Sequence, residues 1–175
     1  MNHALTKVEA QYAVPDLYDH YAVVIRGKPG AGKSTLSNGL LSVITTESKR
    51  TPFQINADYI RRGLNNHLGF TENDRLRQAQ TLGYLARLAV DNGCVPVVDF
   101  VMPTEDTRQA FAAAFGLPFL LVTLTPYHSD NPDRYSDTSA IFDHAVTSDV
   151  IVRNDQDLAD VVALVRKMYA EKGNS

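Results

Sequence analysis

The stretch Gly27-Lys28-Pro29-Gly30-Ala31-Gly32-Lys33-Ser34 matches the pattern G-x-x-x-x-G-K-[ST] at every fixed position. It follows an apolar run, residues 21–25, that is typical of a buried strand, and a helix-compatible segment comes after it. Glycines permit the tight turns that aim consecutive backbone N–H groups at an anion, and the start of a helix adds a positive dipole end. The stretch therefore predicts a phosphate-binding loop.

The same loop predicts a site for ATP and Mg²⁺. Lys33 is expected to reach the β- and γ-phosphates, and the Ser34 hydroxyl is expected to bind the metal ion. Arg153 follows the last predicted strand, where nucleotide kinases commonly place a loop against adenine. The residues expected to bind the nucleotide are Gly27, Lys28, Pro29, Gly30, Ala31, Gly32, Lys33, Ser34, Thr35 and Arg153.

Length and composition favour a single domain. The chain has 175 residues, of which 44% are hydrophobic, and that is too few for two full cores. No apolar run reaches the length of a bilayer span, and the first residues lack the apolar core of a signal peptide, so we expect a cytoplasmic protein without a membrane partner. The acidic excess of residues 101–175 argues against broad binding of duplex DNA but permits a local basic cleft.

Strand and helix patterns alternate along the chain. Strands are predicted at residues 21–25, 53–57, 95–99, 119–124 and 150–152, and helices at residues 33–43, 58–67, 74–91 and 155–169. This alternation predicts an α/β fold of three layers with a mostly parallel five-stranded sheet. Residues 1–20 are expected to form an N-terminal extension, and residues 125–148, rich in Asp, Ser, Tyr and Pro, are expected to form a lid-like insertion.

Two aspartates follow predicted strands, at the sheet edge where ligands of parallel sheets bind. Asp99 ends an apolar strand as a Walker B carboxylate does, so it is expected to bind Mg²⁺, to accept the proton of the acceptor hydroxyl, or to cap a helix near Thr104. Asp58 is expected to orient or deprotonate the acceptor hydroxyl, or to cap its own helix. Arg61, one turn later, would stabilise either an anionic acceptor or the charge on the equatorial phosphoryl oxygens.

The middle of the chain resembles adenylylsulfate kinases, which phosphorylate the 3′-hydroxyl of adenosine 5′-phosphosulfate (APS) with ATP and Mg²⁺. The likeness rests on residues 27–35, on the run Asn56-Ala-Asp-Tyr-Ile-Arg-Arg-Gly-Leu-Asn-Asn-His-Leu-Gly-Phe70, and on Asp74-Arg75. It implies the fold of the P-loop kinases. It also implies that Asp58 lies near the reacting hydroxyl, that Arg61 and Arg75 bind acceptor phosphate, and that Phe70 stacks on the acceptor base. A core role for Phe70 is the alternative.

The chain departs from this family on the acceptor side. Gln78 stands where the family has Asn, and Val101-Met102-Pro103 replaces the usual Ile-Ser-Pro. The family's basic lid is replaced by an acidic segment that contains Arg134 and Asp137. Arg134 is expected to fold over the transferring phosphoryl group. Asp137 is expected to meet the acceptor, bind a water, cap a helix or stabilise a turn.

The segments at residues 99–108 and 134–142 resemble a bacteriophage branch of these kinases, some of which are similar to kinases of 5-hydroxymethyluracil in DNA. The favoured hypothesis is therefore an ATP-dependent kinase of that hydroxymethyl group, acting in the host cytoplasm. The alternative is an adenylylsulfate kinase, whose acceptor is a small adenine nucleotide. A third possibility is a nucleotide-binding module without transfer activity.

Overall fold

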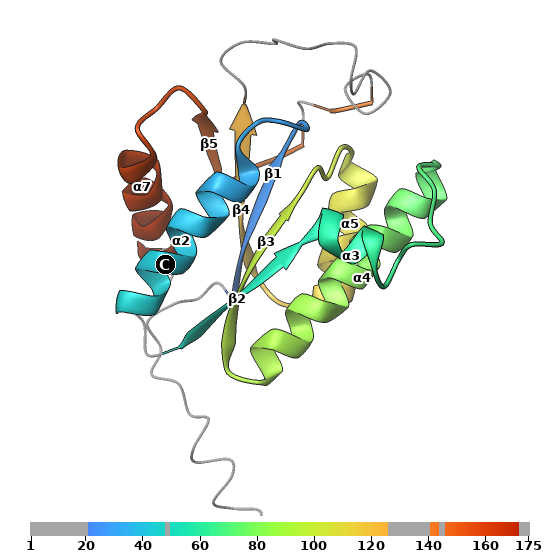
Figure 1. Cartoon of the computed structure of the whole chain (residues 1–175), viewed down its shortest axis with the longest axis horizontal. Coiled ribbons are helices and arrows are strands. Elements are labelled where there is room, and N and C mark those ends of the chain that lie inside the picture. The colour runs from blue at the N-terminus through green and yellow to red at the C-terminus, as the bar shows by residue number, and fades with distance from the viewer. Residues whose placement is uncertain (1–20, 48–49, 126–140, 144–145, 172–175) are drawn as a thin grey trace, which may run out of the picture.

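The computed structural model describes residues 21–47, 50–125, 141–143 and 146–171. Within them, five strands form one sheet in the order β2-β3-β1-β4-β5, and every neighbouring pair is parallel (Figure 1). The strands are β1 (Ala22–Gly27), β2 (Thr51–Asn56), β3 (Cys94–Phe100), β4 (Phe119–Thr125) and β5 (Val150–Arg153). The helices are α2 (Lys33–Glu47), α3 (Ala57–Arg62), α4 (Glu72–Asp91), α5 (Glu105–Phe115) and α7 (Leu158–Glu171). This is the α/β architecture that the alternating pattern predicts.

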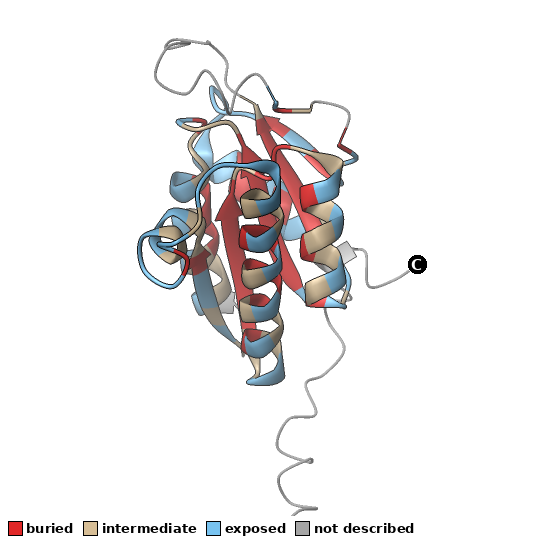
Figure 2. Ribbon diagram, turned by 90° about the vertical axis from the view of Figure 1, so that its right-hand side faces the viewer, coloured by how far each residue is buried: buried red, intermediate tan, exposed pale blue. Residues whose placement is uncertain are grey.

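Helices cover both faces of the sheet. Figure 1 shows α2 and α7 on one side of the strands and α4 and α5 on the other. Buried residues run through the strands and through one side of the helices that cover them, as Figure 2 shows by colour. Burial of apolar side chains in two separate layers is what fixes helices on both sides of a parallel sheet.

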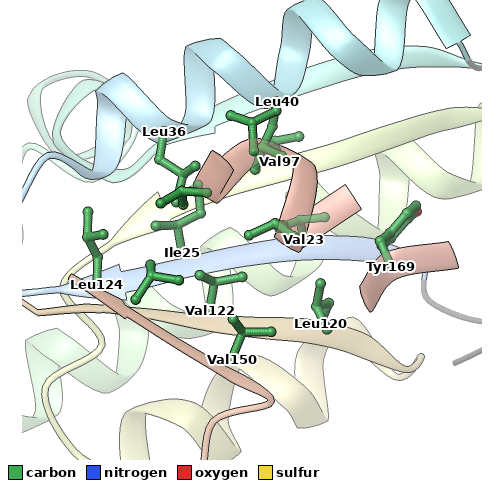
Figure 3. Close-up of a cluster of buried hydrophobic side chains, with 14 of the residues drawn as sticks. Val23, Ile25, Leu36, Leu40, Val97, Leu120, Val122, Leu124, Val150 and Tyr169 are labelled. Carbon is green, nitrogen blue, oxygen red and sulfur yellow. The ribbon is translucent and has the colours of Figure 1, made fainter. Parts of the chain in front are cut away.

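Two apolar clusters make up these layers. On the α2 and α7 side, Leu36 and Leu40 of α2 pack with Ile25 and Val122 of the central strands (Figure 3). On the other side, the cluster contains Ala79, Leu82 and Ala86 of α4, Phe111 and Phe115 of α5, and Val24 and Val98 of the strands. We call the second cluster the α4/α5 core.

Side-chain caps fix the starts of the helices near the carboxyl ends of the strands. Asn56 caps α3, because its side-chain oxygen accepts a hydrogen bond from the Tyr59 amide at 2.9 Å. Thr71 and Asp74 form a reciprocal capping box on α4, and Thr104 and Thr107 form another on α5. Each cap fixes the residue at which the helix begins. The first turn of each helix is thereby held in place after its connecting segment.

The element boundaries differ from the predicted ones in two informative places. The helix predicted at residues 58–67 ends at Arg62, because the chain leaves the helix at Gly63 and continues in turns. The predicted second strand includes Ala57, which instead begins α3. None of the described helices is long and apolar enough to cross a membrane.

Candidate active site

The phosphate-binding loop connects β1 to α2 at the carboxyl edge of the sheet. Gly30 and Gly32 have φ values of 80° and 92°, which side chains other than glycine rarely adopt. Gly27 meets a different demand, because a Cβ atom there would lie 2.6 Å from the Leu124 carbonyl oxygen on β4. The loop therefore has the backbone freedom and the close strand packing that the glycine spacing predicts.

Lys33 begins α2 and extends back over the loop. Its Nζ donates to the Lys28 carbonyl at 3.0 Å. Burial lowers the pKa of Lys33, while the negative charges of Asp58 and Asp99 oppose that shift. The ammonium group is thus held within a loop that offers phosphate ligands, with two carboxylates close enough to affect its ionisation.

Asp99 lies at the end of β3, between β2 and β1. In the strand register it is opposite both Asn56 and Ile25. Asn56 Nδ2 donates to Asp99 Oδ1 at 2.8 Å and reaches Ser34 Oγ at 3.5 Å. The side chain of Asp99 is buried, and its Oδ2 has no hydrogen-bond partner among the described residues. Ser34, Asn56 and Asp99 therefore form one polar cluster beneath the phosphate loop.

Desolvation, together with the negative charge of Asp58, raises the pKa of Asp99 above its ordinary value, although the Ser34 hydroxyl, Lys33 and Asn56 oppose that shift. A buried carboxylate oxygen without a partner is a group that a cation can satisfy. Hydroxyl and carboxylate oxygens are ligands that Mg²⁺ prefers, with phosphate oxygens completing the shell. The donor set of Ser34 and Asp99 therefore fits Mg²⁺. Within the described ranges, no group of three or more His, Cys, Asp or Glu side chains offers a competing metal site.

The helix-cap alternatives for both aspartates are wrong. Asn56 caps α3, so Asp58 lies in the first turn of that helix, with its side chain on the cavity. Thr104 caps α5, so Asp99 does not. Both carboxylates are thus available for chemistry next to Lys33.

Arg61, Phe70 and Arg75 come together opposite the phosphate loop. The guanidinium carbons of Arg61 and Arg75 lie 4.8 Å and 5.6 Å from the centroid of the Phe70 ring. Arg61 Nη1 donates to the Gly69 carbonyl at 2.6 Å, and Arg75 Nε donates to the Phe70 carbonyl at 3.0 Å. Phe70 is 67% exposed, so the core alternative for this ring is wrong.

Two positive charges lie close together at this place. Burial, followed by the like charge of Arg75, lowers the pKa of Arg61, while Asp58 and Asp74 oppose that shift. An anion bound between two guanidinium groups would relieve their repulsion. The exposed ring next to both guanidinium groups offers an apolar surface, so the cluster suits an anion attached to an aromatic base.

Gln78 takes part in a buried amide network. Its Nε2 donates to the Ala57 carbonyl at 3.0 Å, and its Oε1 accepts from Asn65 Nδ2 at 2.7 Å. The network ties α4 to the first residue of α3 and to the turn that follows α3. Gln78 therefore supports the helix that carries Asp58. The sequence does not reveal this role of Gln78.

These groups line one cavity of about 680 Å³. We call the side formed by the phosphate loop the donor end, and the side formed by Arg61, Phe70, Arg75, Gln78 and residues 101–103 the acceptor end. The lining residues are Pro29, Gly30, Gly32, Lys33, Ser34, Thr35, Asn56, Ala57, Asp58, Arg61, Phe70, Arg75, Gln78, Asp99, Phe100, Val101, Met102, Pro103 and Thr107.

Some expected site residues are not among the described residues that line the cavity. Arg134 and Asp137 fall outside the described residues, as does most of the lid-like insertion. Arg153 ends β5, pairs with Asp155 at 3.2 Å and is not among the lining residues, so its contact with adenine stays a prediction. Sequence reasoning missed Asn56 and Thr107. The Asn56-x-Asp58 spacing, which resembles a helix cap followed by an acidic first turn, could have indicated the former.

Comparisons with known proteins agree with this geometry. A family model described as adenylylsulphate kinase matches residues 19–137. An adenylyl-sulfate kinase of Staphylococcus epidermidis is 36% identical over 96 residues, which are 54% of this chain and 48% of that protein. The bifunctional enzyme NodQ of Rhizobium meliloti is 37% identical over 83 residues, which are 47% of this chain and 13% of NodQ.

The matched part of the chain thus spans about half the length of the adenylyl-sulfate kinase and a smaller share of NodQ. The fold is similar to that of the Mycobacterium tuberculosis APS kinase CysC in complex with AMPPNP and APS. That likeness has a TM-score of 0.73 at 20% identity and covers 86% of this chain and 98% of CysC. By the family model, which covers more than half of its residues, the chain belongs to the adenylylsulphate kinase family.

Proposed function

We propose that this protein transfers the γ-phosphoryl group of ATP to a hydroxyl of a small adenine nucleotide, with APS as the acceptor. One observation carries the proposal. One cavity is lined by a phosphate-binding loop, by two carboxylates that act on Lys33, and by an exposed phenylalanine next to two arginines. Such a cavity has room for a phosphoryl donor at one end and an anionic, aromatic acceptor at the other.

The donor end binds the nucleotide by backbone and charge. The loop N–H groups and the Lys33 ammonium would bind the β- and γ-phosphates. Ser34 and Asp99 would hold Mg²⁺, which neutralises charge on the phosphate oxygens when bound. Asp99 has Asn56 on one carboxylate oxygen and an unpartnered buried oxygen on the other, which suits a ligand better than a proton acceptor.

Asp58 is then the general base. Asp58 is exposed, lies in the first turn of α3 and is one of the residues that line the cavity. It would accept the proton of the acceptor hydroxyl while the new O–P bond forms and the bond from the γ-phosphorus to the β,γ-bridging oxygen breaks, leaving ADP. Catalysis in such a reaction comes mainly from positioning and from stabilising charge, which these residues supply.

A second acceptor, the hydroxymethyl group of 5-hydroxymethyluracil in DNA, is a primary alcohol and needs the same chemistry. The resemblance of residues 99–108 to the bacteriophage branch favours it, and Phe70 could stack on an extruded base. The family model and the curated relatives favour the small nucleotide instead. We therefore rank APS first and make the DNA base the competing outcome of the test.

The test is transfer of the labelled γ-phosphate of ATP by the purified protein. APS, DNA containing 5-hydroxymethyluracil and unmodified DNA are compared at equal acceptor concentrations. Label on APS supports the proposal, and its loss in Asp58→Asn ties it to this site. Asp91→Asn serves as the matched control, because Asp91 is an exposed partner of Arg87 on α4, away from the cavity lining.

Other outcomes overturn parts of the proposal. Label on the modified DNA alone would overturn the acceptor while keeping the kinase. ATP binding without transfer to any of the three would overturn both and favour a non-catalytic nucleotide-binding module.

A further inference from the structure

Arg26 lies on the central strand β1, one residue before the phosphate loop, and its side chain is fully buried. Ala22 and Val24, at alternate positions of the same strand, belong to the α4/α5 core. Because side chains alternate between the faces of a strand, Arg26 continues this apolar row. A guanidinium in such a place needs hydrogen bonds and charges that replace water.

Two backbone carbonyls accept hydrogen bonds from the guanidinium. Arg26 Nε donates to the Met102 carbonyl at 3.1 Å, and Arg26 Nη2 donates to the Asp143 carbonyl at 2.8 Å. Its Cζ also lies 4.4 Å from the centroid of the Phe142 ring. One side chain therefore contacts both the segment after β3 and residues 141–143.

Met102 is held in an unusual backbone conformation. Its φ is 43°, in the left-handed region, and its side chain is fully buried. Such a conformation persists only where the surroundings hold it. The Met102 carbonyl accepts from Arg26, and the next carbonyl, that of Pro103, accepts from the Asp143 amide at 2.7 Å. Both Met102 and Pro103 line the acceptor end.

We propose that Arg26 is a positioning residue that fixes the wall of the acceptor end at residues 101–103 to residues 141–143. This proposal rests on the proposed function, because it concerns the end of the cavity that would receive the acceptor. Arg26 is not among the residues that line the cavity, and it acts through the backbone of Met102. The wall then keeps one shape, although its backbone is strained.

An alternative is that Arg26 only stabilises the fold. Burial lowers the pKa of Arg26, while the charges of Asp143 and Glu105 oppose that shift, and an arginine stays charged. Removing the guanidinium leaves the Met102 and Asp143 carbonyls without this donor, so both roles predict a loss of stability in an apolar variant. Only the positioning role predicts, in addition, a change in the KM for APS.

The experiment compares Arg26→Met and Arg26→Lys with the unsubstituted full chain. In Arg26→Met, we expect the KM for APS to rise about 10–100-fold, because a small misplacement of a binding wall has effects of that order. The KM for ATP should stay unchanged, and the denaturation midpoint should fall because two carbonyls lose their donor. The KM for APS of Arg26→Lys should lie between those of Arg26→Met and the unsubstituted chain. One ammonium group keeps the charge but cannot reproduce the planar guanidinium that reaches both carbonyls.

Hydrogen exchange supplies a readout that does not depend on activity. The Asp143 amide should exchange faster in Arg26→Met, while amides of the β1–β4 ladder keep their protection. Thr123→Val is the matched control, because Thr123 is the registered partner of Arg26 on β4 and contacts Ser148. It should alter stability without altering the KM for APS.

The outcomes separate the two proposals. Unchanged exchange at Asp143, or an unchanged KM for APS with a lower midpoint, would overturn the positioning role. Absence of transfer to APS by the unsubstituted chain would overturn the proposed function, and exchange would still test the link made by Arg26. If Arg26→Met does not fold, Phe142→Leu keeps an apolar side chain but removes the ring face, and it should raise the KM for APS in the same direction.

Discussion

At the donor end of the cavity, most of the binding groups belong to one loop between β1 and α2. At the acceptor end, they come from α3, from the turn that carries Phe70, from α4 and from the segment after β3. The shape of the loop depends on the φ values of Gly30 and Gly32 and on the close approach of Gly27 to β4. All three glycines lie in one short stretch of sequence. The acceptor end depends on bonds between distant residues, such as Gln78 with Ala57.

This difference has a consequence for mutation. Among substitutions, only proline removes a backbone N–H group, so the N–H groups of the phosphate loop persist in variants that keep its glycines and add no proline. In the proposed function, acceptor recognition would rest on side chains that are exposed or hydrogen-bonded to distant residues, and each of these can be changed alone. We therefore expect substitutions at the acceptor end to alter the acceptor KM with little effect on ATP.

The largest expected effect is that of Asp58→Asn, because Asp58 lines the cavity and affects the ionisation of Lys33. Loss of a general base should lower kcat by about 10²–10⁴-fold, while the Kd for ATP stays nearly unchanged. Steady-state transfer assays and calorimetric titration with ATP measure the two quantities. A variant that retains full kcat would remove Asp58 from the chemistry and point to Asp99 as the base.

Lys33→Ala tests the side-chain contribution of the donor end. Loss of its ammonium should lower kcat/KM for ATP by about 10²–10³-fold, as removal of one charge-stabilising donor does in other enzymes. The KM for the acceptor should change much less. Arg87→Ala removes an exposed charge of α4 and serves as control. An equal loss for ATP and acceptor would contradict the independence of the two ends.

Phe70→Ala tests the acceptor end alone. Loss of stacking should weaken acceptor binding by about 1–3 kcal/mol, with the KM for ATP unchanged. Phe70→Tyr, which keeps a ring, should restore the KM. Tyr84→Ala is the control, because Tyr84 is a similarly exposed aromatic residue of α4 that does not line the cavity. If both alanine variants behave alike, stacking is not the role of Phe70.

The smallest effect concerns the start of α4, where Asp74 accepts hydrogen bonds from Thr71. The Thr71 side chain, by its hydrogen bond, lowers the pKa of Asp74 below its ordinary value of 3.8. The ionised form is therefore favoured in the folded state. Its contribution to stability is complete above pH 3.8 and disappears as the pH falls through the lower folded value.

Asp74→Asn should therefore reduce stability at pH 7 and flatten the loss of stability between pH 5 and about pH 2. Urea denaturation at a series of pH values measures this dependence. Equal slopes in the variant and the unsubstituted protein would contradict the role of Asp74 as an ionised cap. Asp74 directly precedes Arg75, which lines the acceptor end. The KM of the same variant for the acceptor therefore shows whether a weakened start of α4 affects that end of the cavity.

The phosphate loop and most elements could be predicted from the sequence, because their signals are local. The glycines, Lys33 and Ser34 lie in one stretch, and the apolar strands are bounded by turn residues. Asp58 and Asp99 could also be predicted to share a cavity, because the carboxyl ends of parallel strands meet at one edge.

Arg26 shows what the local pattern leaves out. A charged residue marks the end of an apolar strand, so the predicted strand stops at residue 25, whereas β1 runs through Arg26 to Gly27. The charge is accommodated by carbonyls 76 and 117 residues away, and no local pattern records such partners. The buried Asn65–Gln78 bond, which lies beyond the early end of α3, was hidden for the same reason.

Asn56 limits which sequences this site can tolerate. As the cap of α3, the position would accept Asp, Ser or Thr almost equally well. Its amide nitrogen, however, donates to the buried carboxylate of Asp99, and an aspartate there would oppose one negative charge with another. The capping role alone would permit Asn, Asp, Ser or Thr at position 56. The carboxylate of Asp99 disfavours Asp among these four. Variation at this position should therefore avoid aspartate wherever position 99 keeps its acid.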